Sequence, residues 1–163
     1  MTFGFEHTAD DSIEIDADSG WPVLSTEEFR NHRRIPEYYE ETVIADSLNR
    51  SVLEVQQQIN NYIAKGNTDV SFTLIDGVPQ FSQSQESVYR GAVYARSHSD
   101  LMGYFSAVDQ KETGNNKAED VEQQNQILAQ SNRSIRLLLG LGRAGVHSLW
   151  AKLLASYSKY ANF

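Results

Sequence analysis

The side chains with the greatest catalytic potential in this chain are its four histidines, and they are far apart. They are His7, His32, His98 and His147. None has a second histidine or a carboxylate at the helical spacing of metal ligands, apart from the weak pattern His98-Ser99-Asp100. We therefore interpret them as structural or surface residues, and predict neither a metal site nor a catalytic histidine.

Other reactive groups are equally sparse. The chain has no cysteine, which excludes thiol catalysis, Cys-ligated zinc and disulfides. Gly140-Leu141-Gly142 follows a helical run rather than a strand, so it lacks the context of a dinucleotide site. Glu119, Asp120 and Glu122 cluster where a helix begins, and the helix dipole explains them without acid–base catalysis. We predict that the protein is not an enzyme and has no cofactor.

Charge is divided unevenly along the chain. All 22 Asp and Glu residues lie at or before Glu122, together with nine of the 14 Lys and Arg residues, whereas the five remaining basic residues follow with no carboxylate. Such a division concerns partners rather than fold, and it predicts head-to-tail association of a basic end with an acidic surface. The net charge of −8 argues against general binding to the DNA backbone.

Length and hydropathy predict one domain of a soluble, intracellularly made protein. The 163 residues suffice for a hydrophobic core. The start of the chain lacks the basic and apolar regions of a signal peptide, and no run reaches the roughly 18 apolar residues of a membrane span. We expect an all-α fold, an antiparallel bundle of about four main helices, with an acidic N-terminal arm over residues 1–20, a body over 21–142 and a C-terminal docking segment over 143–163.

The elements of this bundle follow from caps and periodicity. Residues 1–20 are acidic and poor in apolar side chains, which predicts either a mobile arm or a segment ordered by a partner. The run Ser25-Thr26-Glu27-Glu28 fits a capping box for a short helix to about Arg34, and Pro36 suits the first turn of another.

Three longer helices are expected after this. The clearest apolar stripe predicts a helix over 39–65, closed by Gly66. A turn at Asp76-Gly77-Val78-Pro79, with a short strand possible at Val70–Ile75, leads to a helix over 85–108. We attribute Gly91 and Gly103 in that helix to close approach by another helix.

The helix from about Lys117 carries the candidate subunit contacts. Its apolar line Val121, Leu128, Ile135 is flanked by a line containing Asn125, Asn132 and Leu139. Asparagine in a seam sets register and oligomeric state; the alternative is that both face solvent. The residues expected at a subunit interface are Asn125, Asn132, Arg133, Arg136 and Arg143.

The pattern of the last 21 residues predicts an amphipathic helix that is rich in aromatic side chains. One face is apolar and the other carries Ser148, Lys152, Ser156 and Lys159. This stripe could pack on the core, dock into another protein or lie on a membrane surface; aromatic anchors favour docking. The candidate binding residues are Trp150, Leu153, Leu154, Tyr157, Tyr160 and Phe163.

An ordered set of short runs between about residues 20 and 141 resembles the phage head completion (GPL) family of contractile-tailed phages. The runs are Gly20-Trp21-Pro22-Val23, Tyr62-Ile63-Ala64-Lys65-Gly66, Leu74-Ile75-Asp76-Gly77, Tyr89-Arg90-Gly91-Ala92-Val93-Tyr94, Asp100-Leu101 through Tyr104, and Gly114–Asp120. No single run is diagnostic, and the resemblance does not extend to 1–19 or 143–163.

The resemblance implies a structural protein of the virion, made in the host cytoplasm and placed at the portal vertex. Its expected form is a ring, dodecameric by analogy with related adaptors, between the portal protein and tail terminator or neck proteins. Packaged DNA would pass through the lumen without sequence-specific binding, and no membrane is involved. In related adaptors a C-terminal segment enters the portal, which assigns residues 143–163 to portal binding. The alternative is a small helical binding or scaffolding module unrelated to virions.

Overall fold

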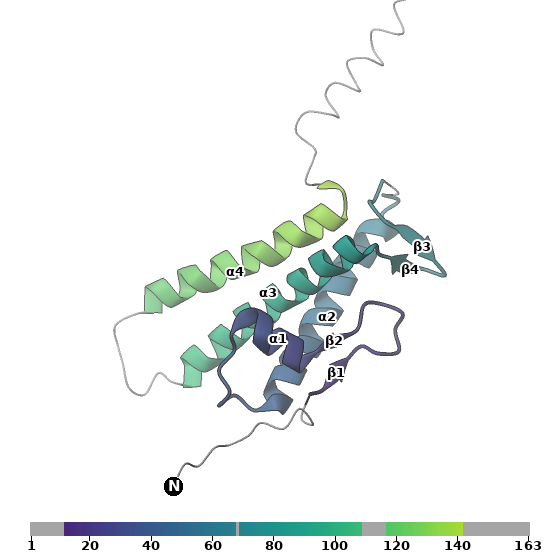
Figure 1. Ribbon diagram of the computed structural model, residues 1–163. Helices are drawn as coiled ribbons and strands as arrows, with labels where there is room; N and C mark the ends of the chain where they lie inside the picture. The colour runs from purple at the N-terminus through teal and green to yellow at the C-terminus, as the bar shows by residue number, and fades with distance from the viewer. Residues whose placement is uncertain (1–11, 68, 109–116, 142–163) are drawn as a thin grey trace, which may run out of the picture.

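The computed structural model describes residues 12–67, 69–108 and 117–141. Its helices are α1 (Thr26–Arg33), α2 (Glu41–Ala64), α3 (Gln83–Val108) and α4 (Lys117–Leu138), and its strands are β1 (Glu14–Ile15), β2 (Leu24–Ser25), β3 (Thr73–Ile75) and β4 (Val78–Gln80). α3 and α4 run antiparallel side by side, α2 packs on α3, and α1 lies across α2 and α3 (Figure 1). The mainly helical class with four helices is confirmed. The purely all-α class is wrong, because two antiparallel strand pairs are present.

Ser25 caps α1 as expected, but Glu28 does not reach back to complete the capping box. Ser25 Oγ accepts a hydrogen bond from the backbone N–H of Glu28 at 3.1 Å. The carboxylate of Glu28 is directed toward α3, where its Oε1 lies 3.5 Å from Nη1 of Arg90. The helix ends at Arg33, and the C-cap residue Arg34 has a left-handed backbone (φ 52°) and donates its N–H to the carbonyl of Arg30.

No helix begins at Pro36, and this expectation is wrong. Residues 36–39 form a turn closed by the Tyr39 N–H on the Pro36 carbonyl at 3.3 Å, and α2 starts at Glu41. The guanidinium of Arg30 donates to the carbonyls of Pro36 and Tyr39 and pairs with the Glu41 carboxylate at 2.7 Å. These contacts stabilise the turn. They also disfavour a continuous helix, because they occupy carbonyls that the helix would need for its own hydrogen bonds.

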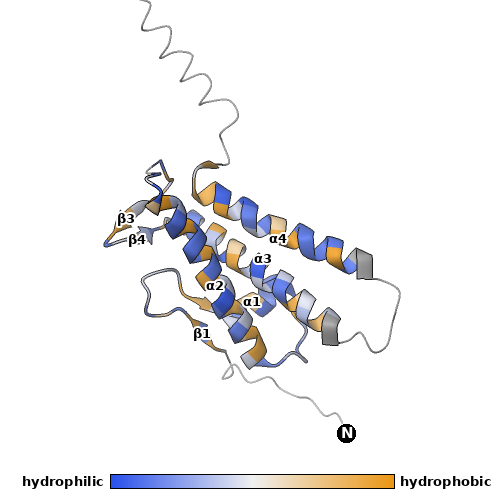
Figure 2. Cartoon of the chain, turned by 180° about the vertical axis from the view of Figure 1, so that it is seen from behind, coloured by the Kyte–Doolittle hydropathy of each residue, from blue (hydrophilic) through white to orange (hydrophobic). Residues whose placement is uncertain are grey.

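α2 shows the predicted periodicity. Ile44, Leu48, Val52, Val55 and Ile59 are buried along one face. Hydrophilic residues cover much of the outer face (Figure 2). Gly66 adopts φ +82° and its N–H bonds the Ile63 carbonyl at 2.9 Å, so glycine closes the helix as expected.

The connection from α2 to α3 contains a tight hairpin. β3 pairs with β4 in the register Thr73–Gln80, Leu74–Pro79, Ile75–Val78. Asp76 (φ 51°) and Gly77 (φ 81°) form the two-residue loop, and positive φ at both positions is the requirement of a type I′ turn. The expected turn is therefore shorter than residues 76–79, since Val78 and Pro79 belong to β4.

The acidic N-terminal segment joins the body earlier than its composition indicates. Ile15 is 1% exposed, and β1 pairs with β2 through Glu14–Ser25 and Ile15–Leu24. Ile13 and Thr26 exchange two hydrogen bonds of 2.9 and 3.1 Å. The expected arm over 1–20 is thus wrong for residues 12–20, because one buried isoleucine and a two-residue ladder are enough to hold them.

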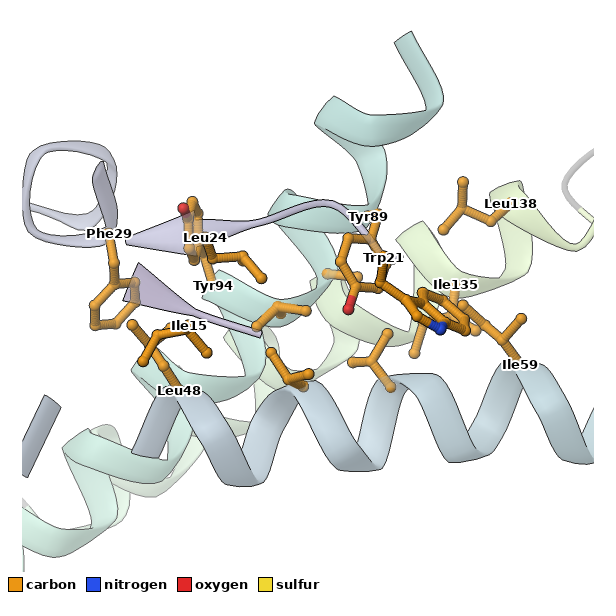
Figure 3. Packing of buried hydrophobic residues seen from close by; sticks show 14 of the residues in the cluster. Ile15, Trp21, Leu24, Phe29, Leu48, Ile59, Tyr89, Tyr94, Ile135 and Leu138 are labelled. Carbon is orange, nitrogen blue, oxygen red and sulfur yellow. The ribbon is translucent and has the colours of Figure 1, made fainter. Parts of the chain in front are cut away.

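The core combines side chains from the first and the last elements that the structure describes. Figure 3 shows Trp21 beside Tyr89, with ring centroids 5.4 Å apart, and Ile59, Ile135 and Leu138 near this pair. A further part of the same cluster contains Ile15, Leu24, Phe29, Leu48 and Tyr94. Each fully buried large apolar side chain contributes about 1.5–3 kcal/mol relative to exposure, so β1, β2 and α1 are integral to the fold.

Small residues and hydrogen bonds form the contact between α3 and α4. Ser99 Oγ donates to the Gln124 carbonyl at 3.1 Å, and Gln124 Nε2 donates to the Ser99 carbonyl at 2.9 Å. A Cβ on Gly103 would lie 2.7 Å from Gln124 Nε2, so this glycine makes room for the amide. No atom lies within 4 Å of the Cβ position of Gly91, so the expected close helix approach is wrong there, and at Gly103 the neighbour is a side chain.

Candidate interaction surfaces

The described residues offer no constellation for metal chemistry. Within residues 12–67, 69–108 and 117–141, no group of three His, Asp or Glu side chains could hold a metal ion. His32 Nε2 is 4.0 Å from Glu28 Oε1, while His98 is half-buried on α3. Burial, with a smaller contribution from Arg33, lowers the pKa of His98. Over the same ranges no helix is long and apolar enough to cross a bilayer.

Arg96 on α3 links three helices. Its guanidinium donates to Glu54 Oε2 at 2.8 Å and Gln58 Oε1 at 3.3 Å on α2. On α4 it donates to Asn132 Oδ1 at 3.1 Å and to the buried Ser131 Oγ at 3.4 Å. Only 11% of the Arg96 side chain is exposed. The sequence analysis missed this residue, although an arginine directly after the apolar run Ala92–Ala95 is a signal for a buried charge with partners.

The candidate subunit residues on α4 lie on its outer side. The buried face contains Ile127, Ser131, Ile135 and Leu138. Of the expected apolar line only Ile135 is buried, while Leu128 is half-buried and Val121 is 54% exposed.

Asn125, Asn132, Arg133 and Arg136 are all exposed, so the asparagines do not form a seam inside the chain. Asn132 accepts the Arg96 hydrogen bond described above. Neither Arg133 nor Arg136 forms an ion pair with any residue that the structure describes. Two cations of α4 are therefore open to a partner.

A second basic group joins α4 to the end of α1. Arg33 is half-buried and donates to Gln130 Oε1 of α4 at 3.3 Å and to the Gly91 carbonyl at 3.4 Å. Burial lowers the pKa of Arg33. Arg34 is exposed, and Arg133 follows Gln130 by three positions on the same flank of α4. We name Arg33, Arg34, Gln130 and Arg133 the α1–α4 basic surface.

The end of the molecule where α2 begins is aromatic. Tyr39 stacks on Phe105 with ring centroids 3.4 Å apart, and beside them Tyr38 is 74% exposed and Tyr104 53% exposed. A shallow pocket of about 260 Å³ opens here, lined by Thr42, Val43, Asp46, Arg50, Leu101 and Tyr104. Exposed aromatics beside charged groups are typical of protein contacts rather than of catalysis.

A second depression of about 330 Å³ lies between the Gly20–Val23 segment and β4. Pro22, Pro79 and Phe81 provide apolar wall, and Glu86 and Arg90 provide charge. The two charged groups pair at 3.8 Å. Apolar side chains beside an ion pair are typical of surfaces that contact other proteins.

The remaining candidate residues fall outside the described ranges. They are Arg143 of the subunit set and Trp150, Leu153, Leu154, Tyr157, Tyr160 and Phe163 of the portal set. Their assignments therefore stay predictions.

Comparison with known proteins gives a consistent result. The model of the family described as "Phage head completion protein (GPL)" matches residues 15–149. The chain is 26% identical over 144 residues to the "Probable head completion/stabilization protein" of Haemophilus phage HP1 (strain HP1c1), covering 84% of this chain and 92% of that protein. No solved structure matches significantly. The family-model match covers residues 15–149, which is most of the chain, and shows that this chain belongs to the phage head completion protein (GPL) family.

Proposed function

We propose that this protein is the adaptor subunit that completes the DNA-filled phage head, as a ring between the portal and the tail or neck. Family membership makes the chain a virion component that contacts other head or tail proteins. The ring, its dodecameric number and its place under the portal extend this role. The observation that carries the proposal is the family match over residues 15–149.

The distribution of charge supports a repeated head-to-tail contact. Arg133 and Arg136 lie exposed on α4 without an ion pair among the described residues, whereas the chain as a whole carries −8. Closed cyclic assemblies repeat a heterologous contact, and opposite charges on its two sides favour one orientation. Asn125 and Asn132 flank the same surface of α4 and would supply uncharged hydrogen bonds, with Arg143 extending the basic side.

The C-terminal segment 143–163 is the proposed portal contact. Its residues Trp150, Leu153, Leu154, Tyr157, Tyr160 and Phe163 share aromatic or aliphatic character, and large aromatic anchors dominate the affinity of protein interfaces. Lys152 and Lys159 on the opposite face would steer the segment toward an acidic crevice. In the assembled ring, packaged DNA would pass through the lumen without base-specific contacts.

The test is imaging of the purified protein by negative stain, with and without portal protein. We expect rings on portal from the full chain, and none from a chain lacking residues 143–163 that keeps its helical circular dichroism. Trp150→Ala with Tyr157→Ala should reproduce the loss, whereas the matched change Lys152→Gln should weaken binding only at low salt. Retained portal binding by the shortened chain would refute the portal assignment but not the ring.

A further inference from the structure

Arg33 is a half-buried cation whose partners in the structure are neutral. It donates to Gln130 Oε1 at 3.3 Å and to the Gly91 carbonyl at 3.4 Å. By contrast, the four arginines that bridge other elements each meet a carboxylate: Arg30, Arg50, Arg90 and Arg96. Partial burial of a charge without an opposite charge is unfavourable, so an anionic ligand would stabilise this site.

The neighbours of Arg33 strengthen the demand for negative charge. Arg34 is exposed, Arg133 lies one helical turn beyond Gln130, and neither has an ion pair among the residues that the structure describes. Several cations around one surface fit a ligand with several negative charges better than a single carboxylate.

An exposed apolar side chain adjoins the same cations. Leu137 is 53% exposed, and at helical spacing it falls between Gln130 and Arg133 around the axis of α4. A ligand for the α1–α4 basic surface should therefore combine carboxylates with at least one large apolar side chain.

The chain itself contains a segment of this composition. Residues 1–11 carry Glu6, Asp10 and Asp11 with no Lys or Arg, and they include Phe3 and Phe5. We propose that residues 1–11 dock on the α1–α4 basic surface of their own chain, with the carboxylates on the arginines and a phenylalanine against Leu137. This inference does not rest on the ring or on portal binding, although Arg133 belongs both to the proposed subunit contact and to this surface.

The position of the chain at residue 12 makes the contact reachable. Ile13 is hydrogen-bonded to Thr26, the first residue of α1, and Arg33 is the last. α1 spans roughly 12 Å at 1.5 Å per residue. Residues 1–11 reach up to about 36 Å when extended, so they can pass along α1 and arrive at α4. Tethering gives the segment an effective concentration in the millimolar range, which favours docking on its own chain.

Because the chain has no cysteine, one introduced cysteine can carry a spin label at a single position. A nitroxide label on Thr2→Cys in the ¹⁵N-labelled full chain should broaden the amide signals of Arg33, Arg34, Gln130 and Arg133 by paramagnetic relaxation. Broadening should be strong near about 0.1 M salt and lost near 1 M, where the Debye length falls to roughly 3 Å. Signals of the β3–β4 hairpin serve as an internal reference.

Charge variants identify the partners on both sides. Arg33→Gln should reduce the ratio of docked to undocked segment by up to about fivefold, as for one partly exposed ion pair. Glu6→Gln, Asp10→Asn and Asp11→Asn together should abolish the broadening. The matched control Lys65→Gln removes an exposed cation at the far end of α2 and should leave the pattern unchanged.

Three results would overturn the inference. The first is broadening that is absent at low salt or centred on another surface. The second is a pattern unaffected by the acidic triple variant. The third is intermolecular broadening. It is tested in a mixture of two chains, one with the nitroxide and natural-abundance nitrogen and the other with ¹⁵N and no nitroxide, and broadening there would place the segment on a second copy.

Discussion

Removing the charge of Arg96 should destabilise the fold by separating α4 from α2. In Arg96→Met the methionine keeps much of the packing volume but loses four hydrogen bonds, to Glu54, Gln58, Asn132 and the buried Ser131. A hydrogen bond to a charged group contributes about 1.5–3 kcal/mol, and an orphaned buried hydroxyl costs about 1–3 kcal/mol.

Solvent moderates this loss. Glu54 has a 59% exposed side chain and can be hydrated after the substitution, so the loss of its ion pair changes the free energy of unfolding only slightly. The expected loss in free energy of unfolding is then about 2–3 kcal/mol, dominated by Ser131 and Asn132. For a chain of this length each kcal/mol lowers Tm by about 2–4 °C, which gives a decrease of roughly 5–10 °C.

Denaturation in urea followed by far-UV circular dichroism measures the free energy, and a thermal scan measures Tm. The matched control is Arg50→Met, since Arg50 also bridges α2 and α3, with Asp46 and Asp100, but its side chain is 54% exposed. We expect no more than about 1 kcal/mol from the control. Equal losses in the two variants, or a loss below about 0.5 kcal/mol for Arg96→Met, would refute the assignment of Arg96 as the link between the helices.

Further predictions concern α1, the hairpin and α3. Ser25→Ala removes the N-cap hydrogen bond of α1 and should cost about 1 kcal/mol in chemical denaturation, whereas Ser87→Ala on an exposed turn of α3 should cost less than half of that. Gly77→Val places a β-branched residue at φ 81° and should cost more than 1–2 kcal/mol, approximately the left-handed penalty of an ordinary residue; unchanged stability would argue against the type I′ turn. The folded-state pKa of His98 lies below its ordinary value, so the unfolded chain binds this proton more readily and stability should decrease as the pH falls below about 6.5. His98→Gln should flatten the pH profile of the unfolding free energy over this interval; an unchanged slope would show that other groups cause it.

Local signals predicted the long helices well. α2 occupies 41–64 against an expected 39–65, and α3 occupies 83–108 against 85–108. A long apolar stripe and a terminal glycine are strong local determinants, since tertiary contacts reinforce them along the whole length.

The short elements were harder to predict, because their stability comes from distant contacts. β1 and β2 have two residues each, and the burial of Ile15 against helices is invisible to composition. The turn at Pro36 depends on where the Arg30 side chain goes. A proline at that position is equally compatible with a helical first turn, so the local pattern alone could not decide.

The interaction surfaces were predicted in part. Sequence reasoning selected Arg133 and Arg136, since they follow the last carboxylate, and the structure places both on the outer side of α4. It did not select Arg33 or Arg96, because their importance depends on which helices meet. Whether an arginine meets a carboxylate or only neutral acceptors is a property of the packing, not of the neighbours in sequence.

The contact between α3 and α4 determines how these arginines are presented. Ser99 and Gln124 hold the two helices by reciprocal hydrogen bonds of 3.1 and 2.9 Å. Rotation or sliding of α4 by one residue would break both bonds and the contacts of Arg96, leaving buried Ser99 and Ser131 with fewer partners. A purely apolar contact between two helices would tolerate such a shift more easily than this polar one, because hydrophobic contacts are not directional. The polar contact therefore sets the register of α4, and with it the positions at which Arg133 and Arg136 face a partner.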